Sequence, residues 1–364
     1  MKEKSFTMPP YLKALSVLIF IIVLVFFLIV GKSLLVPLFM GGFFAVLFTP
    51  FSNWLESKKV PRTISAVLSL LLNIAIVVGL LVFIITTISN FTSDFDNVSE
   101  KLSNYAKDID EWTMTNFGID ENFEEKASDD YIKTLLQEQG ANITGFALRT
   151  VGSLSGTVLI PVFMFFFLLY RDHLTEVMIR IYRDKDPQLV KMRITNLRKL
   201  LQNYIIGVVK VMGILAVLNV TAFTALGIKH AIFFGLIAAF LNIIPYVGPF
   251  IGALMPMVYA FLTKDSLFYP IAVLVSYQLI QLIEGNILTP KIVGGNVNLN
   301  PFITFLGLLV GGTIWGVAGM VLIIPTLAIL REIFELSDQT SPFALLLGEE
   351  RSDEKSKEKS SESG

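Results

Sequence analysis

The sequence predicts an all-α membrane protein with about eight hydrophobic segments, two of them interrupted by Pro and Gly in the C-terminal half. Hydrophobic residues make up 54% of the 364 residues, and charged residues make up only 16%. A soluble domain carries about 25% charged residues, so long apolar runs in lipid explain the deficit. The net charge of −1 excludes a basic surface for nucleic acid. The chain has no cysteine, which excludes disulfides and cysteine metal sites.

Six apolar runs are expected to cross the membrane as helices, because each approaches the about 20 residues that span the hydrocarbon core. The first run follows Lys2, Lys4 and Lys13, but no small-residue cleavage site comes after it. An uncleaved first span is therefore expected instead of a signal peptide. The six runs are residues 14–30, 34–51, 64–88, 151–170, 204–227 and 268–283.

The Lys and Arg residues of the short loops predict that both termini are cytoplasmic. The loop with Lys58, Lys59 and Arg62 then lies inside, and residues 89–146 lie outside with 13 acidic and 4 basic residues, a net charge of −9. A helical stripe in 89–146 favours either a small helical cap or a partner-binding domain. The predicted parts are 1–88 with three spans, 89–146 as an extracytoplasmic helical segment, 147–203 with the fourth span and a basic amphipathic helix, 204–335 as the transport core, and 336–364 as a disordered tail.

The first interrupted segment is residues 231–262, in which two apolar halves flank Pro245–Pro249. Each half has about 13 residues and is about 20 Å long as a helix, which is too short to cross the bilayer. Two prolines remove backbone donors and Gly248 permits positive φ, so one unbroken helix is excluded. A single broken span and a re-entrant hairpin with its tip at Pro245–Pro249 both remain open, and the short halves favour the hairpin. Broken helices at this depth are where transporters bind substrates and ions.

The second interrupted segment is residues 301–330, which is entered through Asn300-Pro301 and contains Pro325 near its end. Glycines punctuate its middle, and the pair Gly311-Gly312 predicts a second hairpin tip. The same spacing of small residues is also typical of closely packed membrane helices, so both interpretations stay open.

Polar side chains are few in the predicted spans. Gln278, Gln281 and Glu284 repeat every three residues, which predicts roughly one helical face. Ionisable residues at membrane depth are functional candidates; Glu284 could bind Na⁺ or a proton, or could lie at a solvated span end. Lys210 could pair with Glu284 or could extend to the membrane interface.

The candidate substrate or ion pathway combines the two breaks with this polar face. No nucleotide-binding or hydrolase motif occurs, so neither an enzyme, a metal site nor a cofactor is expected. The pathway candidates are Asn242, Pro245, Gly248, Pro249, Gln278, Gln281, Glu284, Asn286, Asn300, Pro301, Gly311 and Gly312, with Glu284 and Lys210 as the candidates for ion coupling.

Three stretches resemble the autoinducer-2 exporter family of membrane transporters: Asn242–Gly252 (NIIPYVGPFIG), Gln281–Gly294 (QLIEGNILTPKIVG) and Asn298–Pro325. The resemblance implies a multi-pass secondary transporter of the prokaryotic cell membrane, associated with export of autoinducer-2 or with Na⁺(Li⁺)/H⁺ antiport. It also implies homo-oligomers, pentamers among them. A non-transporting membrane scaffold, with residues 89–146 and 184–203 as its interaction surfaces, is a further alternative from a different functional class.

Overall fold

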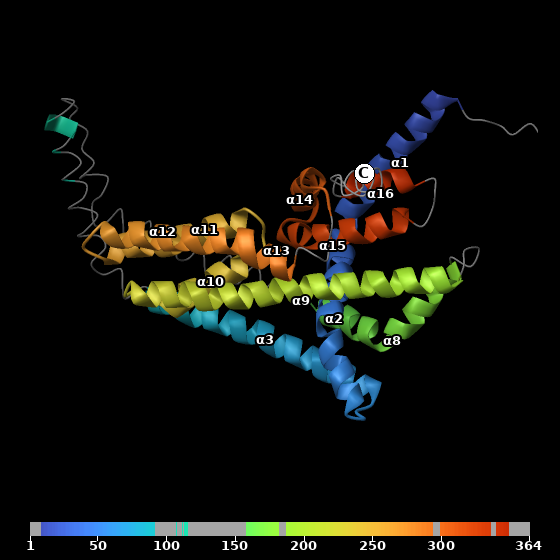
Figure 1. Cartoon of the computed structure of the whole chain (residues 1–364), viewed down its shortest axis with the longest axis horizontal. Coiled ribbons are helices and arrows are strands. Elements are labelled where there is room, and N and C mark those ends of the chain that lie inside the picture. The colour runs from blue at the N-terminus through green and yellow to red at the C-terminus, as the bar shows by residue number, and fades with distance from the viewer. Residues whose placement is uncertain are drawn as a thin grey trace, which may run out of the picture. The chain divides into compact units, whose positions relative to one another are not determined.

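The computed structural model describes residues 9–91, 158–181, 187–293, 299–335 and 340–348, with 107, 111 and 113–115. Regular secondary structure in these residues is helical (Figure 1), apart from an isolated bridge between Leu299 and Gly348. The all-α prediction is confirmed for this part of the chain. The predicted stripe in 89–146 lies almost wholly outside the described residues. The prediction of a disordered tail over 336–364 is wrong for Ser341–Leu347, which form the helix α16, and the residues after 348 lie outside the described part of the chain.

The chain forms two compact units. The first unit comprises Met1–Ala45, Gly156–Arg171 and Leu299–Gly364, and the second comprises Val46–Ser155 and Asp172–Asn298. The first interrupted segment therefore belongs to the second unit, and the second interrupted segment belongs to the first.

The first unit contains α1 (Pro10–Val30), α14 (Pro301–Trp315), α15 (Val317–Phe334) and α16 (Ser341–Leu347), with parts of α2 (Lys32–Ser57) and α8 (Leu159–Ile181). Trp315 holds three of these helices together. Its indole Nε1 donates a hydrogen bond to the backbone oxygen of Leu28 at 2.9 Å, and its ring lies 5.5 Å from that of Phe39.

The second unit contains α3 (Arg62–Phe91), α9 (Pro187–Ala225), α10 (Ala231–Leu241), α11 (Val247–Thr263) and α12 (Phe268–Ile283). A π-helical turn η2 (Glu284–Leu288) and α13 (Thr289–Ile292) follow α12. Figure 1 shows α10, α11 and α12 running along the C-terminal part of α9. Their contact surfaces are apolar, with Phe223, Phe234 and Val273 among the buried side chains.

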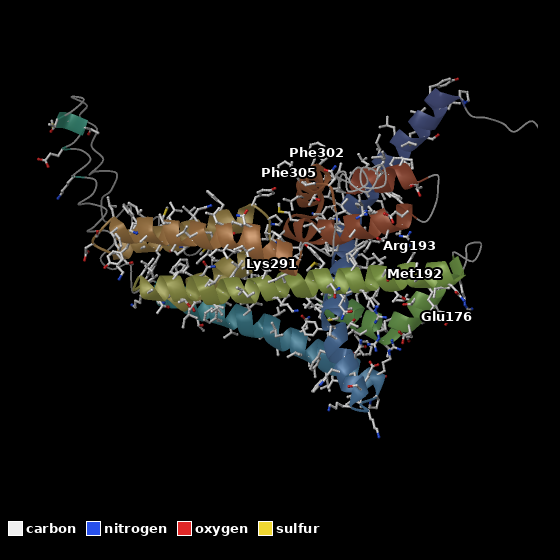
Figure 2. All side chains as sticks on the ribbon, viewed as in Figure 1. Glu176, Met192, Arg193, Lys291, Phe302 and Phe305 are labelled. Atoms are coloured by element: carbon white, nitrogen blue, oxygen red, sulfur yellow. The ribbon has the colours of Figure 1, made fainter. Side chains whose placement is uncertain are left out.

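The expected boundary between an amphipathic helix at 184–203 and a span from 204 is absent. The structure has one helix, α9, of 39 residues, because this stretch has no internal proline and helix propagation is cooperative. Figure 2 shows Met192 and Arg193 on its N-terminal part. α8 likewise continues past Tyr170 to Ile181.

Within the described residues, five helices are long and apolar enough to cross a membrane. They are Lys32–Ser57, Arg62–Thr87, Lys191–Ala225, Phe268–Ile292 and Val317–Phe334. Four further apolar helices are shorter: Leu15–Val30, Ala231–Leu241, Val247–Thr263 and Pro301–Trp315. The prediction of a polytopic membrane protein is confirmed, and α15 is long enough for a full span, contrary to the expected half-length.

Candidate functional site

The first interrupted segment folds as a hairpin of two packed helices. α10 packs on α9, where Gly235 lies against Val220, and α11 returns beside it with the backbone of Gly252 against Ala238. Gly252 also faces the hydroxyl of Tyr277 on α12. The break at Asn242–Tyr246 therefore reverses the chain, which excludes a single kinked span.

The depth of the hairpin tip can be measured along α12. Asn242, at the tip, contacts Gln281, which is 13 residues after Phe268, the first residue of α12. This distance is about 20 Å at 1.5 Å per residue. The candidate span continues to Ile292, about 16 Å farther by the same rise. The tip thus ends part-way along a helix that is long enough to cross the membrane.

Gly248 acts at this tip through close packing and not through the positive φ that the sequence suggested, which Tyr246 adopts instead. A Cβ at Gly248 would lie 1.8 Å from the carbonyl oxygen of Leu241, so only glycine lets the end of α10 and the start of α11 approach this closely. Gly248 and Pro249 already belong to α11, whose first residue is Val247. The tip is therefore Asn242–Tyr246, about three residues earlier than predicted.

Tyr246 has a strained backbone. Its φ is 64° and its ψ is −51°, and the amide of Val247 donates to the carbonyl of Pro245 at 2.7 Å. These values define a γ-turn with positive φ, which is rare and strained. A non-glycine residue in such a region costs about 1–3 kcal/mol.

Three polar side chains meet beside the tip. Nε2 of Gln281 donates to the hydroxyl oxygen of Tyr277 at 2.9 Å and to Oδ1 of Asn242 at 3.3 Å. Tyr277 is buried, whereas Asn242 and Gln281 are half-buried. In the described part of the chain, Oε1 of Gln281 and Nδ2 of Asn242 make no further hydrogen bond, which leaves one acceptor and one donor next to each other.

Glu284, three residues after Gln281, is the first residue of a π-helical turn. The amide of Thr289 donates to the carbonyl of Glu284, five residues earlier, and its hydroxyl donates to the Glu284 carboxylate. Pro290 cannot donate the next backbone hydrogen bond, and a widened turn accommodates that loss. π-turns of this kind occur frequently at functional sites.

The predicted polar face is only partly correct. Gln281 and Glu284 are half-buried, but Gln278 and Asn286 are exposed, and the amide of Asn286 donates to the carbonyl of Leu282. Each step of three residues falls about 60° short of a full turn at 3.6 residues per turn. Gln278 is therefore about 120° from Glu284 even before the π-turn.

The pairing of Lys210 with Glu284, which the sequence left open beside extension of Lys210 to the membrane interface, is not present among the described residues. Lys210 is exposed on α9, and no ion pair joins it to another described residue. Lys291 on α13, labelled in Figure 2, is the basic residue nearest to Glu284 in the sequence, and its side chain is also exposed. The Glu284 carboxylate has Thr289 as its hydrogen-bond donor instead.

The second interrupted segment also reverses, but at Gly316 and not at Gly311-Gly312. Gly316 has φ 62° and ψ −139°, a region that is essentially restricted to glycine. Gly311 lies inside α14, where its backbone contacts Gly319 of α15, and Gly312 lies against Met320. These two glycines therefore permit close helix packing, the alternative that the sequence left open.

Asn300 and Pro301 begin α14. The Asn300 side chain accepts from the amides of Phe302 and Ile303, at 2.9 and 3.5 Å, and Pro301 occupies the first helical position. Both residues are favoured at these positions in any helix. Figure 2 shows Phe302 and Phe305 in the following turns.

Two buried groups were not found from the sequence. Tyr277 could have been found, because it lies four residues before Gln281 on one helix face. Asn219 on α9 is 0% exposed, and neither polar atom of its side chain has a partner in the structure. An orphaned buried amide costs about 1–3 kcal/mol, and no sequence signal marks it.

Comparison with known proteins gives relatives that are named for transport. The chain is 27% identical over 326 residues to "Putative transport protein YueF" of Bacillus subtilis (strain 168), with 85% of each chain covered. It is 27% identical over 342 residues to "Putative transport protein YrrI" of the same strain, covering 87% of this chain and 93% of the relative. "AI-2 transport protein TqsA" of Escherichia coli (strain K12) is 34% identical over 125 residues, which are 34% of this chain and 36% of the relative.

A family model covers nearly all of the described helices. The AI-2E family transporter model matches residues 15–338, a range that includes both hairpins, the amide network and the π-turn. This is a family of multi-pass membrane transporters and not of enzymes, in agreement with the five candidate spans. The chain belongs to the AI-2E transporter family.

Proposed function

We propose that this protein is a secondary transporter of the cell membrane that exports a small, uncharged polar metabolite such as autoinducer-2. Family membership supplies the activity class, and the name of TqsA supplies the candidate molecule. In this proposal the hairpin of α10 and α11 is re-entrant, and its tip forms part of the pathway.

The amide network at the tip carries the proposal. Asn242 and Gln281 keep one donor and one acceptor without a protein partner in the described chain, and both side chains are half-buried. A hydroxyl group donates and accepts at once, so it matches this pair. A site for an anionic substrate would be expected to contain Arg or Lys. The charged residue that follows Gln281 in the sequence is instead acidic, Glu284.

The π-turn favours a second candidate function, Na⁺(Li⁺)/H⁺ antiport. Glu284, the first residue of this turn, is half-buried and lies three residues after Gln281. The hydroxyl of Thr289 donates a hydrogen bond to its carboxylate. Oxygen ligands of this kind suit a monovalent cation or a proton. Glu284 is the only acidic side chain of the segment from Phe268 to Ile292.

Reconstituted flux separates the two functions. Proteoliposomes loaded with autoinducer-2 or with ²²Na⁺ are followed with no gradient, with a sodium gradient and with a pH gradient. Export predicts autoinducer-2 efflux that Glu284→Gln retains. Antiport predicts ²²Na⁺ flux that depends on the pH gradient and is abolished by Glu284→Gln. Absence of both fluxes under every gradient would contradict transport and favour a membrane scaffold.

A further inference from the structure

Three charged side chains from three helices of the second unit meet near the start of α3. Nη1 of Arg62, the first residue of α3, donates a hydrogen bond to Oδ2 of Asp172 on α8 at 2.8 Å. Nη1 of Arg198 on α9 lies 4.0 Å from the other oxygen of the same carboxylate. We call these three residues the arginine cluster. It holds two positive charges against one negative charge.

The protein supplies few acceptors for the two guanidinium groups of the cluster. Each group has five N–H donors, and within the described residues the bond from Arg62 to Asp172 is the one hydrogen bond that either group makes. Nε and Nη2 of Arg62 are buried without a partner. A buried charge that is incompletely hydrogen-bonded is costly, so a further anion beside the cluster would stabilise it.

The cluster lies beside the ends of two candidate membrane spans. The span Lys32–Ser57 ends just before the turn at 58–61, and the span Arg62–Thr87 begins just after it. Trp54 is 56% exposed, and its ring lies 5.9 Å from that of Phe51. An exposed tryptophan at a span end is typical of the membrane–water interface, which is the depth of the lipid headgroups.

The residues around this turn add positive charge. Lys58 and Lys59 are exposed, and neither forms an ion pair with another residue of the described chain. Glu56 is the acidic residue between Trp54 and Arg62, and it accepts a hydrogen bond from Ser52 at 3.2 Å. The positive charge near Arg62 is therefore only partly balanced by acidic residues.

The cluster is open to the headgroup layer on one side. The side chain of Asp172 is 66% exposed and that of Arg198 is 37% exposed, so a phosphate group can reach the guanidinium of Arg198. The covered nitrogens of Arg62 act on such a group through their charge and not through contact.

We propose that the arginine cluster binds the headgroup phosphate of an anionic phospholipid, with Arg198 as the contact residue and Arg62 as the charge behind it. Phosphate oxygens accept two parallel N–H bonds from one guanidinium, and basic pockets between membrane helices bind anionic headgroups. The loop charges predict that this end of α3 is cytoplasmic, where the membrane surface is negative. Asp172 positions both arginines, and its own charge limits the affinity for the lipid.

The test measures the melting temperature of the purified full-length protein in neutral detergent, titrated with phosphatidylglycerol or with phosphatidylcholine of the same acyl chains. Phosphatidylglycerol is expected to raise the melting temperature by about 2–5 °C more than phosphatidylcholine does. Arg198→Gln should weaken the apparent affinity for phosphatidylglycerol about fivefold. Arg180→Gln is the matched control, because it removes the same charge from a pair with Glu176 (Figure 2) that lies outside the cluster. Its affinity should equal that of the wild type.

Asp172→Asn distinguishes a lipid site from an ion pair that only supports the fold. Without the carboxylate, both arginines are free for phosphate, so the affinity for phosphatidylglycerol should rise about fivefold. The melting temperature without lipid should fall, because the charge of Arg62 loses its partner. An ion pair with a purely structural role predicts the same fall in melting temperature with no gain in lipid affinity.

Three results would overturn the inference. The first is equal stabilisation of the wild type by the two lipids, and the second is an affinity for phosphatidylglycerol that Arg198→Gln leaves intact or that Asp172→Asn does not raise. The third is stabilisation by inorganic phosphate as strong as that by phosphatidylglycerol at the same concentration, which would assign the site to a free anion. Since none of these measurements involves transport, failure of the export proposal would leave the inference standing.

Discussion

Gln281 connects the hairpin to the helix beside it, because one amide nitrogen bonds both Tyr277 on its own helix and Asn242 at the tip. Interhelical hydrogen bonds in membrane proteins contribute about 0.6 kcal/mol each. The network therefore positions the tip more than it stabilises the fold.

Gln281→Ala should consequently affect transport more than stability. We expect a loss of about 1 kcal/mol of stability, measured as a small fall in the melting temperature in detergent, together with a reduction of autoinducer-2 efflux of about tenfold. Gln278→Ala is the control, since Gln278 is exposed on the same helix. Equal efflux in the two variants would show that the network is not part of the pathway.

At this scale the sequence identifies residue types better than their partners. The sequence singles out Asn242 and Gln281 as pathway candidates because polar groups in apolar segments are rare. Their pairing across 39 residues is a tertiary contact that no local pattern contains. The sequence left the pairing of Glu284 with Lys210 open for the same reason, because the face of α9 that is buried against α10 is a matter of tertiary packing.

At the scale of elements, the sequence predicts that a helix is interrupted, but the residue at which the chain turns depends on which glycines pack against a neighbouring helix. Pro245 and Gly248 predict the first reversal within three residues of its position. In the second segment, Gly311 and Gly312 lie in a helix that packs on α15, and a single later glycine, Gly316, makes the turn. The sequence alone does not distinguish a glycine that turns the chain from one that faces a neighbouring helix.

Gly248→Ala tests the close approach at the first tip. The added Cβ would overlap the Leu241 carbonyl, so we expect a loss of more than about 2 kcal/mol of stability, seen as early thermal unfolding and low recovery of folded protein. Gly213→Ala on α9 is the matched control, because nothing lies within 4 Å of its added Cβ. That variant should be as stable as wild type or more stable, by up to about 1 kcal/mol. Similar stability of both variants would contradict the close packing of the tip.

At the scale of the whole molecule, hydropathy predicts a polytopic membrane protein, and the structure and the family confirm it. Loop charges predict cytoplasmic termini, which stays a prediction. Whether α10 and α11 form a re-entrant hairpin or cross the membrane decides where the pathway lies. The short α10 and the contact of the tip with Gln281, part-way along α12, support the hairpin.

Sidedness of single cysteines tests this central claim most directly, and the cysteine-free chain makes the labelling unambiguous. Lys229→Cys precedes α10 and Lys264→Cys follows α11, while Lys58→Cys marks the predicted cytoplasmic side. In intact cells, a membrane-impermeant maleimide should label positions 229 and 264 alike, and should label position 58 only after permeabilisation. Tyr246→Cys adds a label at the tip itself. Labelling of position 246 only from the side opposite to positions 229 and 264 would show that both helices cross the membrane, and would contradict the re-entrant hairpin and the pathway built on it.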